Sequence, residues 1–285
     1  MHSLTTNPAD SPHFDLTAVK SAIAATPFAG HLHHFRTTPS TNDLALRAAQ
    51  KGARIGVWIA DQQIAGRGRG RHTWHSPAGA GLYMTALIAP PIPMQSALSL
   101  SLRVAIAVQS AIISTTSFSR PDQIDIRWPN DLLLNGKKCG GILIDTASNP
   151  ATPSQPATLR YAVVGIGINI NQASFPLELD GIATSLRREL VTQPASPVPR
   201  EPLTAAILLA LDDEVRALTA NLEPQTANLS AYSTWITGKR VRVEARDGVP
   251  GYTGTTAGLN PQGFLLVAGD DGQIHTVLSG GLREP

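Results

Sequence analysis

Apolar and polar positions recur along the chain with two different periods, and the segments that carry them predict its helices and strands. Helical spacing marks residues 15–25, 44–49, 96–114 and 203–222. Short apolar runs typical of buried strands occupy residues 55–60, 82–89, 124–128, 141–145 and 161–170. Because helical and strand segments are interspersed, the pattern predicts an α+β domain over most of the chain.

Turn and loop residues divide the chain further. Residues 39–43 form a turn or a helix N-cap, and Asn135-Gly136 is a strong hairpin signal. Residues 148–158 are rich in Pro, Ser and Thr and predict a mobile surface loop, whereas residues 192–202 predict a linker or a long irregular connection. After residue 235, short strands alternate with Gly, Asn-Pro and Asp-Gly turns. This pattern predicts a small all-β barrel, with strands at residues 241–243, 251–256, 264–267 and 274–278.

The composition limits the class of protein. A chain of 285 residues that is 42% hydrophobic can bury one sizeable core and a smaller satellite domain. The net charge of +2 and the pI near 8.9 suit phosphate-containing ligands but fall short of a nucleic-acid-binding protein. The single cysteine, Cys139, excludes an internal disulfide and favours the reducing cytosol. Neither a signal peptide nor an apolar membrane span is visible, so we expect a cytoplasmic protein.

The most informative motif is the alternation of glycine and arginine over residues 65–71, which Trp74 follows closely. Glycine lets the backbone approach a ligand, and the arginine fork donates paired hydrogen bonds to carboxylate or phosphate. The alternative is a flexible RNA-binding tail of the RGG kind. Such tails need many repeats in disordered surroundings, whereas this single run lies between two predicted strands. The segment therefore predicts an anion-binding loop.

Two further segments carry polar residues next to predicted strands. Residues 127–131 (Arg-Trp-Pro-Asn-Asp) place a carboxylate and an amide at a rigid turn, and Lys138 follows across the hairpin. Taken alone, a solvated Asp–Lys pair worth ~0.5 kcal/mol is the better interpretation of this segment. Residues 165–171 (Gly-Ile-Gly-Ile-Asn-Ile-Asn) lack the third glycine and the helix of a dinucleotide-binding fingerprint. They are typical of a buried strand whose glycines admit a ligand.

The histidines and the remaining tryptophans have a simpler interpretation. His31, His33 and His34 cluster near the N-terminus, but no nearby acidic or cysteine residue completes the ligand spacing of a zinc site. We expect these histidines on the surface, and we expect no metal site formed by side chains of the protein. Trp58 and Trp235 are expected in the core or at the junction of the domains.

Together these motifs resemble the biotin–protein ligases, in order and in rough spacing, over residues 36–285. The resemblance implies a class II synthetase-like biotin/lipoate ligase catalytic domain, with a central mixed sheet flanked by helices, and a small C-terminal SH3-like β-barrel. The implied division is an N-terminal extension with a first helix at residues 1–35, a catalytic domain at 36–232 and the barrel at 233–285.

The resemblance also implies a set of site residues. Those expected to bind biotin or its adenylate are Ser40, Thr41, Asn42, Gln63, Gly66, Arg67, Gly68, Arg69, Trp74, Asn130, Lys138, Gly141, Gly167 and Asn169. The catalytic residues among the matching positions are Lys138, Arg67, Arg69 and Asp131, and Asp131 would deprotonate or orient the acceptor lysine. ATP and biotin would be the substrates, with Mg2+ accompanying ATP. The protein partner would be the biotin carboxyl carrier of a biotin-dependent carboxylase. A homodimer through the edge of the central sheet is a further, weaker implication.

This chain departs from the family pattern at three places. Arg127 stands where the family usually has lysine, and Gly70-Arg71-His72 replaces the usual end of the loop. The residues ahead of Ser40 are too few for the DNA-binding domain of some relatives, so we expect no DNA binding. The alternatives are a lipoate–protein ligase, a biotin-responsive DNA-binding regulator and a non-catalytic nucleotide-binding module. The glycine–arginine loop and the Trp-Pro-Asn-Asp turn favour biotin over lipoate.

Overall fold

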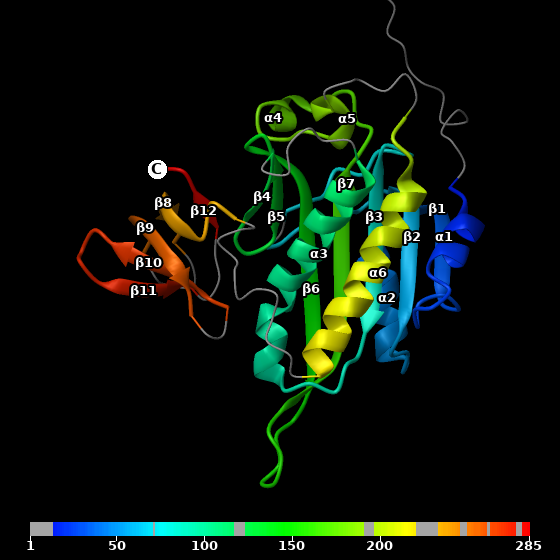
Figure 1. Ribbon diagram of the computed structural model, residues 1–285, viewed down its shortest axis with the longest axis horizontal. Coiled ribbons are helices and arrows are strands. Elements are labelled where there is room, and N and C mark those ends of the chain that lie inside the picture. The colour runs from blue at the N-terminus through cyan, green and yellow to red at the C-terminus, as the bar shows by residue number, and fades with distance from the viewer. Residues whose placement is uncertain are drawn as a thin grey trace, which may run out of the picture.

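A computed structural model describes residues 14–70, 72–116, 123–190, 197–220, 233–245, 250–260, 263–277 and 281–285. Two β-sheets organise these residues, and helices flank only the larger sheet (Figure 1). The larger sheet has seven strands and the smaller, which is C-terminal, has five. The predicted α+β class and the all-β C-terminal segment are therefore confirmed.

The seven strands of the large sheet lie in the order β1-β2-β3-β7-β6-β5-β4. Their bounds are β1 Leu32–Thr38, β2 Gly56–Gln63, β3 Gly81–Ile88, β4 Ile124–Arg127, β5 Asp131–Leu134, β6 Lys137–Asn149 and β7 Thr158–Asn169. Strands β1 and β2 pair in parallel and all other neighbours pair antiparallel, which makes the sheet mixed. The prediction of a central mixed sheet is confirmed.

Helices cover both faces of this sheet. The helices on the first face are α1 (Leu16–Ala22), α3 (Leu100–Thr115), which continues the 3-10 helix η2 (Met94–Ser99), and α6 (Arg200–Thr219). Figure 1 shows α3 and α6 lying side by side over the strands. Helix α2 (Thr41–Gln50) packs on β2, β3 and β7 from the opposite side. Two short helices, α4 (Leu177–Asp180) and α5 (Leu186–Glu189), follow the end of β7.

Each face of the sheet buries its own set of side chains, because successive residues of a strand point to opposite faces. The larger cluster joins α1, α3 and α6 to side chains such as Val57, Ile166 and Ile168. The smaller cluster joins α2 to Trp58 and Val163. Helix α3 is apolar nearly all round, as expected of a helix that is buried on most sides.

The small sheet packs against the far edge of the large one. Its order is β11-β10-β9-β8-β12, with bounds β8 Thr237–Val243, β9 Tyr252–Leu259, β10 Leu265–Gly269, β11 Ile274–Val277 and β12 Leu282–Arg283. Trp235 lies at the junction with Trp128 and Leu133 of the large unit. The Ser233 hydroxyl donates to the Ile126 carbonyl at 2.6 Å, which joins the small unit to β4. The expected position of Trp235 at the junction is confirmed.

Four details differ from the predicted elements. Strands β1 and β5 were not predicted. The long strands β6 and β7 extend to Asn149 and Thr158, so much of the predicted loop at 148–158 is the end of a projecting hairpin (Figure 1). Helix α6 begins at Arg200, inside the predicted linker, because proline is tolerated in the first turn of a helix. Among the described residues, no helix is long and apolar enough to cross a membrane.

Candidate active site

A pocket opens on the α2 side of the large sheet. Its walls come from the start of α2, the end of β2, the glycine–arginine loop, the first half of β6 and the last part of β7. The lining residues are Thr41, Asn42, Gln63, Arg67, Gly68, Arg69, Trp74, Met84, Asn130, Lys138, Gly141, Ile142, Leu143, Gly165, Ile166 and Gly167. Residues that are widely separated in the sequence thus converge on one cavity.

Glycines form the floor of the pocket because side chains from other segments lie directly on the strands. Gly141 and Gly167 face each other across β6 and β7, and the Trp74 indole lies on both. A Cβ atom at Gly167 would come within 2.6 Å of Trp74 Cε2 and Nε1. A Cβ atom at Gly165 would come within 2.2 Å of Asn42 Oδ1. The glycines of β7 are therefore required by the close approach of Trp74 and Asn42.

The N-terminal end of α2 supplies the polar wall of the pocket. Ser40 caps the helix by accepting a hydrogen bond from the Asp43 amide at 3.4 Å, as its position predicts. The amide and hydroxyl of Thr41 both donate to Gln63 Oε1, at 2.8 and 3.1 Å. Asn42 accepts from the Thr85 hydroxyl at 2.6 Å, but its Nδ2 is buried and has no hydrogen-bond partner among the described residues. A buried amide donor of this kind suits a polar ligand.

The glycine–arginine loop is folded back on itself over the pocket. The Trp74 amide donates to the Gly66 carbonyl at 2.9 Å, and the Gly68 amide donates to the His72 carbonyl at 2.8 Å. Arg67 Nη1 lies 2.9 Å from Asp43 Oδ1 and 3.6 Å from Asp145 Oδ2. These contacts hold one arginine of the loop between α2 and β6. Arg71 lies outside the described residues.

Arg69 reaches the opposite wall of the pocket. Its Nη1 donates to Asn130 Oδ1 at 3.3 Å, while Asn130 Nδ2 donates to the Ile142 carbonyl at 2.8 Å. Asn130 thus joins the loop to β6. The Trp128–Pro129 peptide bond before it is cis.

The carboxylate of Asp131 lies between two cations. Lys138 Nζ is 2.6 Å from Asp131 Oδ1, and Arg127 Nη2 is 2.6 Å from Asp131 Oδ2. Burial alone would raise the pKa of Asp131, but the Lys138 ammonium and the Arg127 guanidinium together hold it below its ordinary value. Lys138 Nζ also lies 5.5 Å from the centre of the Trp74 ring. The lysine is therefore at the edge of the pocket, held by the carboxylate.

Most of the predicted site residues, ligand-binding and catalytic, line the pocket, and four do not. Those that do not line it are Ser40, Gly66, Asp131 and Asn169. Gly66 packs against the Trp74 carbonyl, where a Cβ atom would come within 2.6 Å of the oxygen. Asn169 Nδ2 donates to the Thr184 carbonyl at 3.1 Å and so joins the end of β7 to the segment before α5. Five lining residues were not among the predicted site residues: Met84, Ile142, Leu143, Gly165 and Ile166. Gly165 and Ile166 belong to the 165–171 motif, and the other three lie in predicted strands whose register would have been needed to find them.

His33, His34 and Cys139 lie outside the pocket lining. His33 stacks on Trp58 with ring centres 5.3 Å apart, and His34 Nε2 lies 3.2 Å from Asp61 Oδ2. Within the described ranges, no three His, Cys, Asp or Glu residues are grouped in a way that could hold a metal ion. Burial raises the pKa of the Cys139 thiol to about 12, so this cysteine is not a nucleophile at neutral pH.

The arrangement is suited to one kind of ligand. Two arginines, one lysine and the amino end of α2 surround a cavity with an aromatic and glycine floor. Fixed cations and a helix N-terminus stabilise negative charge, whereas the flat indole and the bare backbone accept an apolar or planar group. The pocket therefore fits an anion that has an apolar or ring-shaped part.

Comparisons with known proteins agree with this geometry. Residues 34–169 match the family described as "Biotin/lipoate A/B protein ligase family", and residues 236–280 match "Biotin protein ligase C terminal domain". The chain is 34% identical to the bifunctional ligase/repressor BirA of Bacillus spizizenii over 239 residues, which are 83% of this chain and 67% of the relative. It is 32% identical to the biotin–[acetyl-CoA-carboxylase] ligase of Mycobacterium tuberculosis over 247 residues, 86% of this chain and 85% of the relative.

A solved structure shares the fold. The biotin protein ligase of Aquifex aeolicus in complex with biotin and ATP superposes with a TM-score of 0.69 at 24% identity. The match covers 90% of this chain and 99% of that one.

Proposed function

Since the chain belongs to the biotin protein ligase family, we propose a role for each polar side chain of the pocket in the two steps of the ligase reaction. In the first step the enzyme joins biotin to the AMP part of ATP, which releases pyrophosphate and gives biotinyl-5′-AMP. In the second step it transfers biotin from this adenylate to a lysine of a protein acceptor. The observation that carries the assignment of roles is the Lys138–Asp131 pair beside Trp74 and the loop arginines.

Biotin binds at the end of the pocket that α2 closes. Thr41, Asn42 and Gln63 present hydrogen-bonding groups there, and the free Nδ2 of Asn42 is a donor for a polar ring of the ligand. Ser40 acts through its cap, which keeps this end of α2 in place. Gly66 and Gly68 let the loop lie close to the ligand, and the glycine floor at residues 141 and 167 supports Trp74 for contact with the nucleotide.

Negative charge builds up on the oxygens around the α-phosphorus of ATP as the biotin carboxylate attacks it and pyrophosphate leaves. Arg67, Arg69 and Lys138 stabilise this charge, because fixed cations act more strongly in a pocket that excludes water than in solution. Asn130 holds Arg69 in place through its side-chain oxygen. Folding of the loop over the adenylate protects the mixed anhydride from hydrolysis.

Asp131 orients Lys138 and the acceptor lysine and does not take a proton from either. Its pKa lies below the ordinary value, so the carboxylate stays charged at neutral pH and is a weak base. Both of its oxygens already accept from Lys138 and Arg127. We therefore assign Asp131 to holding Lys138 at the reacting atoms and to attracting the acceptor amine. Arg127, which replaces the usual lysine, supplies the second cation.

Magnesium accompanies ATP as its usual partner. Mg2+ prefers oxygen ligands and keeps several waters, so the phosphate oxygens of ATP together with water could supply most of its ligands. Over the described part of the chain no cluster of three ligating side chains is present, which suits an ion carried by the nucleotide. When bound, the ion neutralises phosphate charge, and the residues of this chain then bind and orient the phosphates.

The family supports a proposal for the acceptor, and the cysteine content supports one for the compartment. The enzyme acts on a protein that carries biotin, and we propose the biotin carboxyl carrier of a biotin-dependent carboxylase as this acceptor. We propose the cytoplasm as the compartment, in keeping with a single, buried cysteine. Strand β1 is the edge of the large sheet, and pairing through it would give the homodimer; sedimentation of the purified protein tests this.

The proposed activity is tested by measuring the release of pyrophosphate from ATP in the presence of magnesium. The purified chain should release pyrophosphate with biotin and not with lipoate. Pyrophosphate release with lipoate alone would make lipoate the substrate in place of biotin. No release with either compound would favour a non-catalytic nucleotide-binding module. Lys138→Ala and Arg67→Ala should each lower adenylate formation by about tenfold or more without unfolding the protein. Wild-type turnover by either variant would remove that residue from the mechanism.

A further inference from the structure

The backbone of Lys138 lies beyond the end of its neighbouring strand. The ladder between β6 and β7 stops at the pair Gly140 and Ile168, because the chain after Asn169 turns away toward Ala80. On its other side Lys138 still pairs with Leu133 of β5. The proposed catalytic lysine lies at the start of β6. Without a further partner, this part of β6 would be an unpaired edge on the β7 side.

A short extended segment occupies that place. The Lys138 amide donates to the Ile182 carbonyl at 2.9 Å, and the Thr184 amide donates to the Lys138 carbonyl at 3.0 Å. Residues 182–184, which we call the flanking segment, therefore pair in parallel with β6 at Lys138 alone. Because both backbone groups of Lys138 are bonded, the position of its Cα depends directly on this segment.

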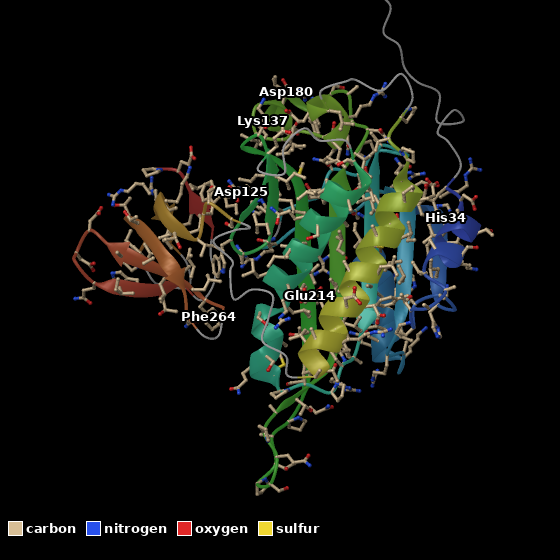
Figure 2. The ribbon with its side chains drawn as sticks, in the orientation of Figure 1. His34, Asp125, Lys137, Asp180, Glu214 and Phe264 are labelled. Atoms are coloured by element: carbon tan, nitrogen blue, oxygen red, sulfur yellow. The ribbon has the colours of Figure 1, made fainter. Side chains whose placement is uncertain are left out.

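Side chains in turn hold the flanking segment. Glu189, on α5, accepts from the Thr184 hydroxyl at 2.6 Å with Oε1 and from Asn135 Nδ2 at 2.7 Å with Oε2. Asn135 belongs to the turn that leads into β6, so Glu189 joins the two stretches of chain that flank Lys138. Asn169 Nδ2 adds a bond to the Thr184 carbonyl from the end of β7. Figure 2 labels Lys137, next in sequence to Lys138, and Asp180, at the end of α4, at the same end of the large sheet in that view.

These contacts point to a role that goes beyond the pocket itself. We propose that Glu189 is a positioning residue for the ligase reaction: through Thr184 and Asn135 it sets the backbone of Lys138, and so the place of the lysine ammonium beside Asp131. The inference rests on the proposed role of Lys138. It also gives Asn169 a function as a support of the same segment, in place of a contact with the ligand.

Misplacement of Lys138 affects the chemical step more than substrate binding. A shift of about 1 Å at a reacting group costs about a hundredfold in rate, whereas the residues expected to hold biotin lie on α2 and β2, away from Glu189. Glu189→Leu, which removes both acceptors, should lower kcat for adenylate formation by about ten- to a hundredfold with little change in KM for biotin.

Glu189→Gln is the matched control. Its amide oxygen can accept from Asn135, and its amide nitrogen can donate to the Thr184 hydroxyl, so both links survive while the charge is lost. This variant should stay within about threefold of wild-type kcat, since a neutral hydrogen bond replaces a charge-assisted one. A loss as large as that of Glu189→Leu would show that charge, and not positioning, is responsible, and would overturn the proposal.

A double-mutant cycle separates positioning from general damage. If Glu189 acts through Lys138, then Glu189→Leu in a Lys138→Ala background should lower the rate by no more than about twofold. Equal losses in both backgrounds, or a wild-type rate for Glu189→Leu, would refute the inference. Thr184→Val removes only the hydroxyl link and provides the same cycle if Glu189→Leu does not fold; its expected loss is about threefold.

The wild-type rate with biotin is measured first. A wild-type chain that makes no adenylate would refute the proposed function, whereas an active wild type with a fully active Glu189→Leu variant would refute only the role of Glu189.

Discussion

Gly167→Ala should disable the pocket while leaving the fold intact. The new Cβ would lie 2.6 Å from two atoms of the Trp74 indole, a separation that no van der Waals contact allows. The indole lies on a loop and is only half-buried, whereas Gly167 lies in β7 between two paired strands. The ring therefore has to yield, and it should leave the floor of the pocket.

The size of the effect follows from this geometry. Forcing an added methyl into a packed site costs typically about 1–3 kcal/mol, and each 1.4 kcal/mol is about tenfold in affinity. If the ring is displaced, this cost appears in ligand binding, and ATP affinity should fall by about five- to a hundredfold. Alanine is favoured over glycine in a strand by about 0.5–1 kcal/mol, so the free energy of unfolding should change little.

Titration calorimetry with ATP and urea unfolding measure the two quantities separately. Iodide quenching reports the ring itself, because Trp58, Trp128 and Trp235 are buried and Trp74 is the accessible indole. Quenching should increase in Gly167→Ala. Gly30→Ala, where a Cβ meets nothing within 4 Å, is the control and should bind ATP normally. Wild-type affinity together with wild-type quenching in Gly167→Ala would refute the argument that Trp74 depends on a bare strand.

Three further outcomes can be measured. In Gly165→Ala the new Cβ would come within 2.2 Å of Asn42 Oδ1, so the affinity for biotin should fall by about tenfold and the affinity for ATP much less. Calorimetry with each ligand measures both affinities, and equal losses would contradict the assignment of α2 to biotin binding. The carboxylate of Asp131 has a lowered pKa in the folded protein, so its stabilising effect is present above the unfolded-state value near 3.8 and is lost as the pH falls through the folded value. The difference in unfolding free energy between wild type and Asp131→Asn should therefore be constant near neutral pH and shrink below about pH 4; a difference that grows on acidification would contradict the sign. Cys139, fully buried with a thiol pKa of about 12, should resist iodoacetamide at pH 8 in the native state and react after unfolding, as mass spectrometry would detect.

Local signals in the sequence located much of this site. The glycine–arginine alternation marked the loop, Asn135-Gly136 marked the turn into β6, and the residues after proline in the 127–131 segment marked the carboxylate. Each of these depends on backbone freedom or side-chain chemistry within a few residues, which a sequence records directly. The apolar runs likewise marked the central strands, since a buried strand needs apolar side chains whatever its neighbours are.

Other elements gave weak local signals. Strand β1 has only two apolar residues, Leu32 and Phe35, so neither strand alternation nor an apolar run marks it. Strand β5 is only four residues long and comes directly after the turn that contains Pro129, so its residues did not predict a separate strand. Edge and short strands are defined by their partners more than by their own composition.

The amino-acid sequence by itself determined the kinds of element, the chemistry of the loop and the resemblance to the ligases. Tertiary structure alone decided which groups meet: that Arg67 lies between Asp43 and Asp145, that Trp74 lies on Gly141 and Gly167, and that Asn169 donates to the Thr184 carbonyl. The physical reason is range. Periodicity records which face of an element is buried, whereas the partner of a polar group tens of residues away depends on strand order and register, which only the folded chain brings together.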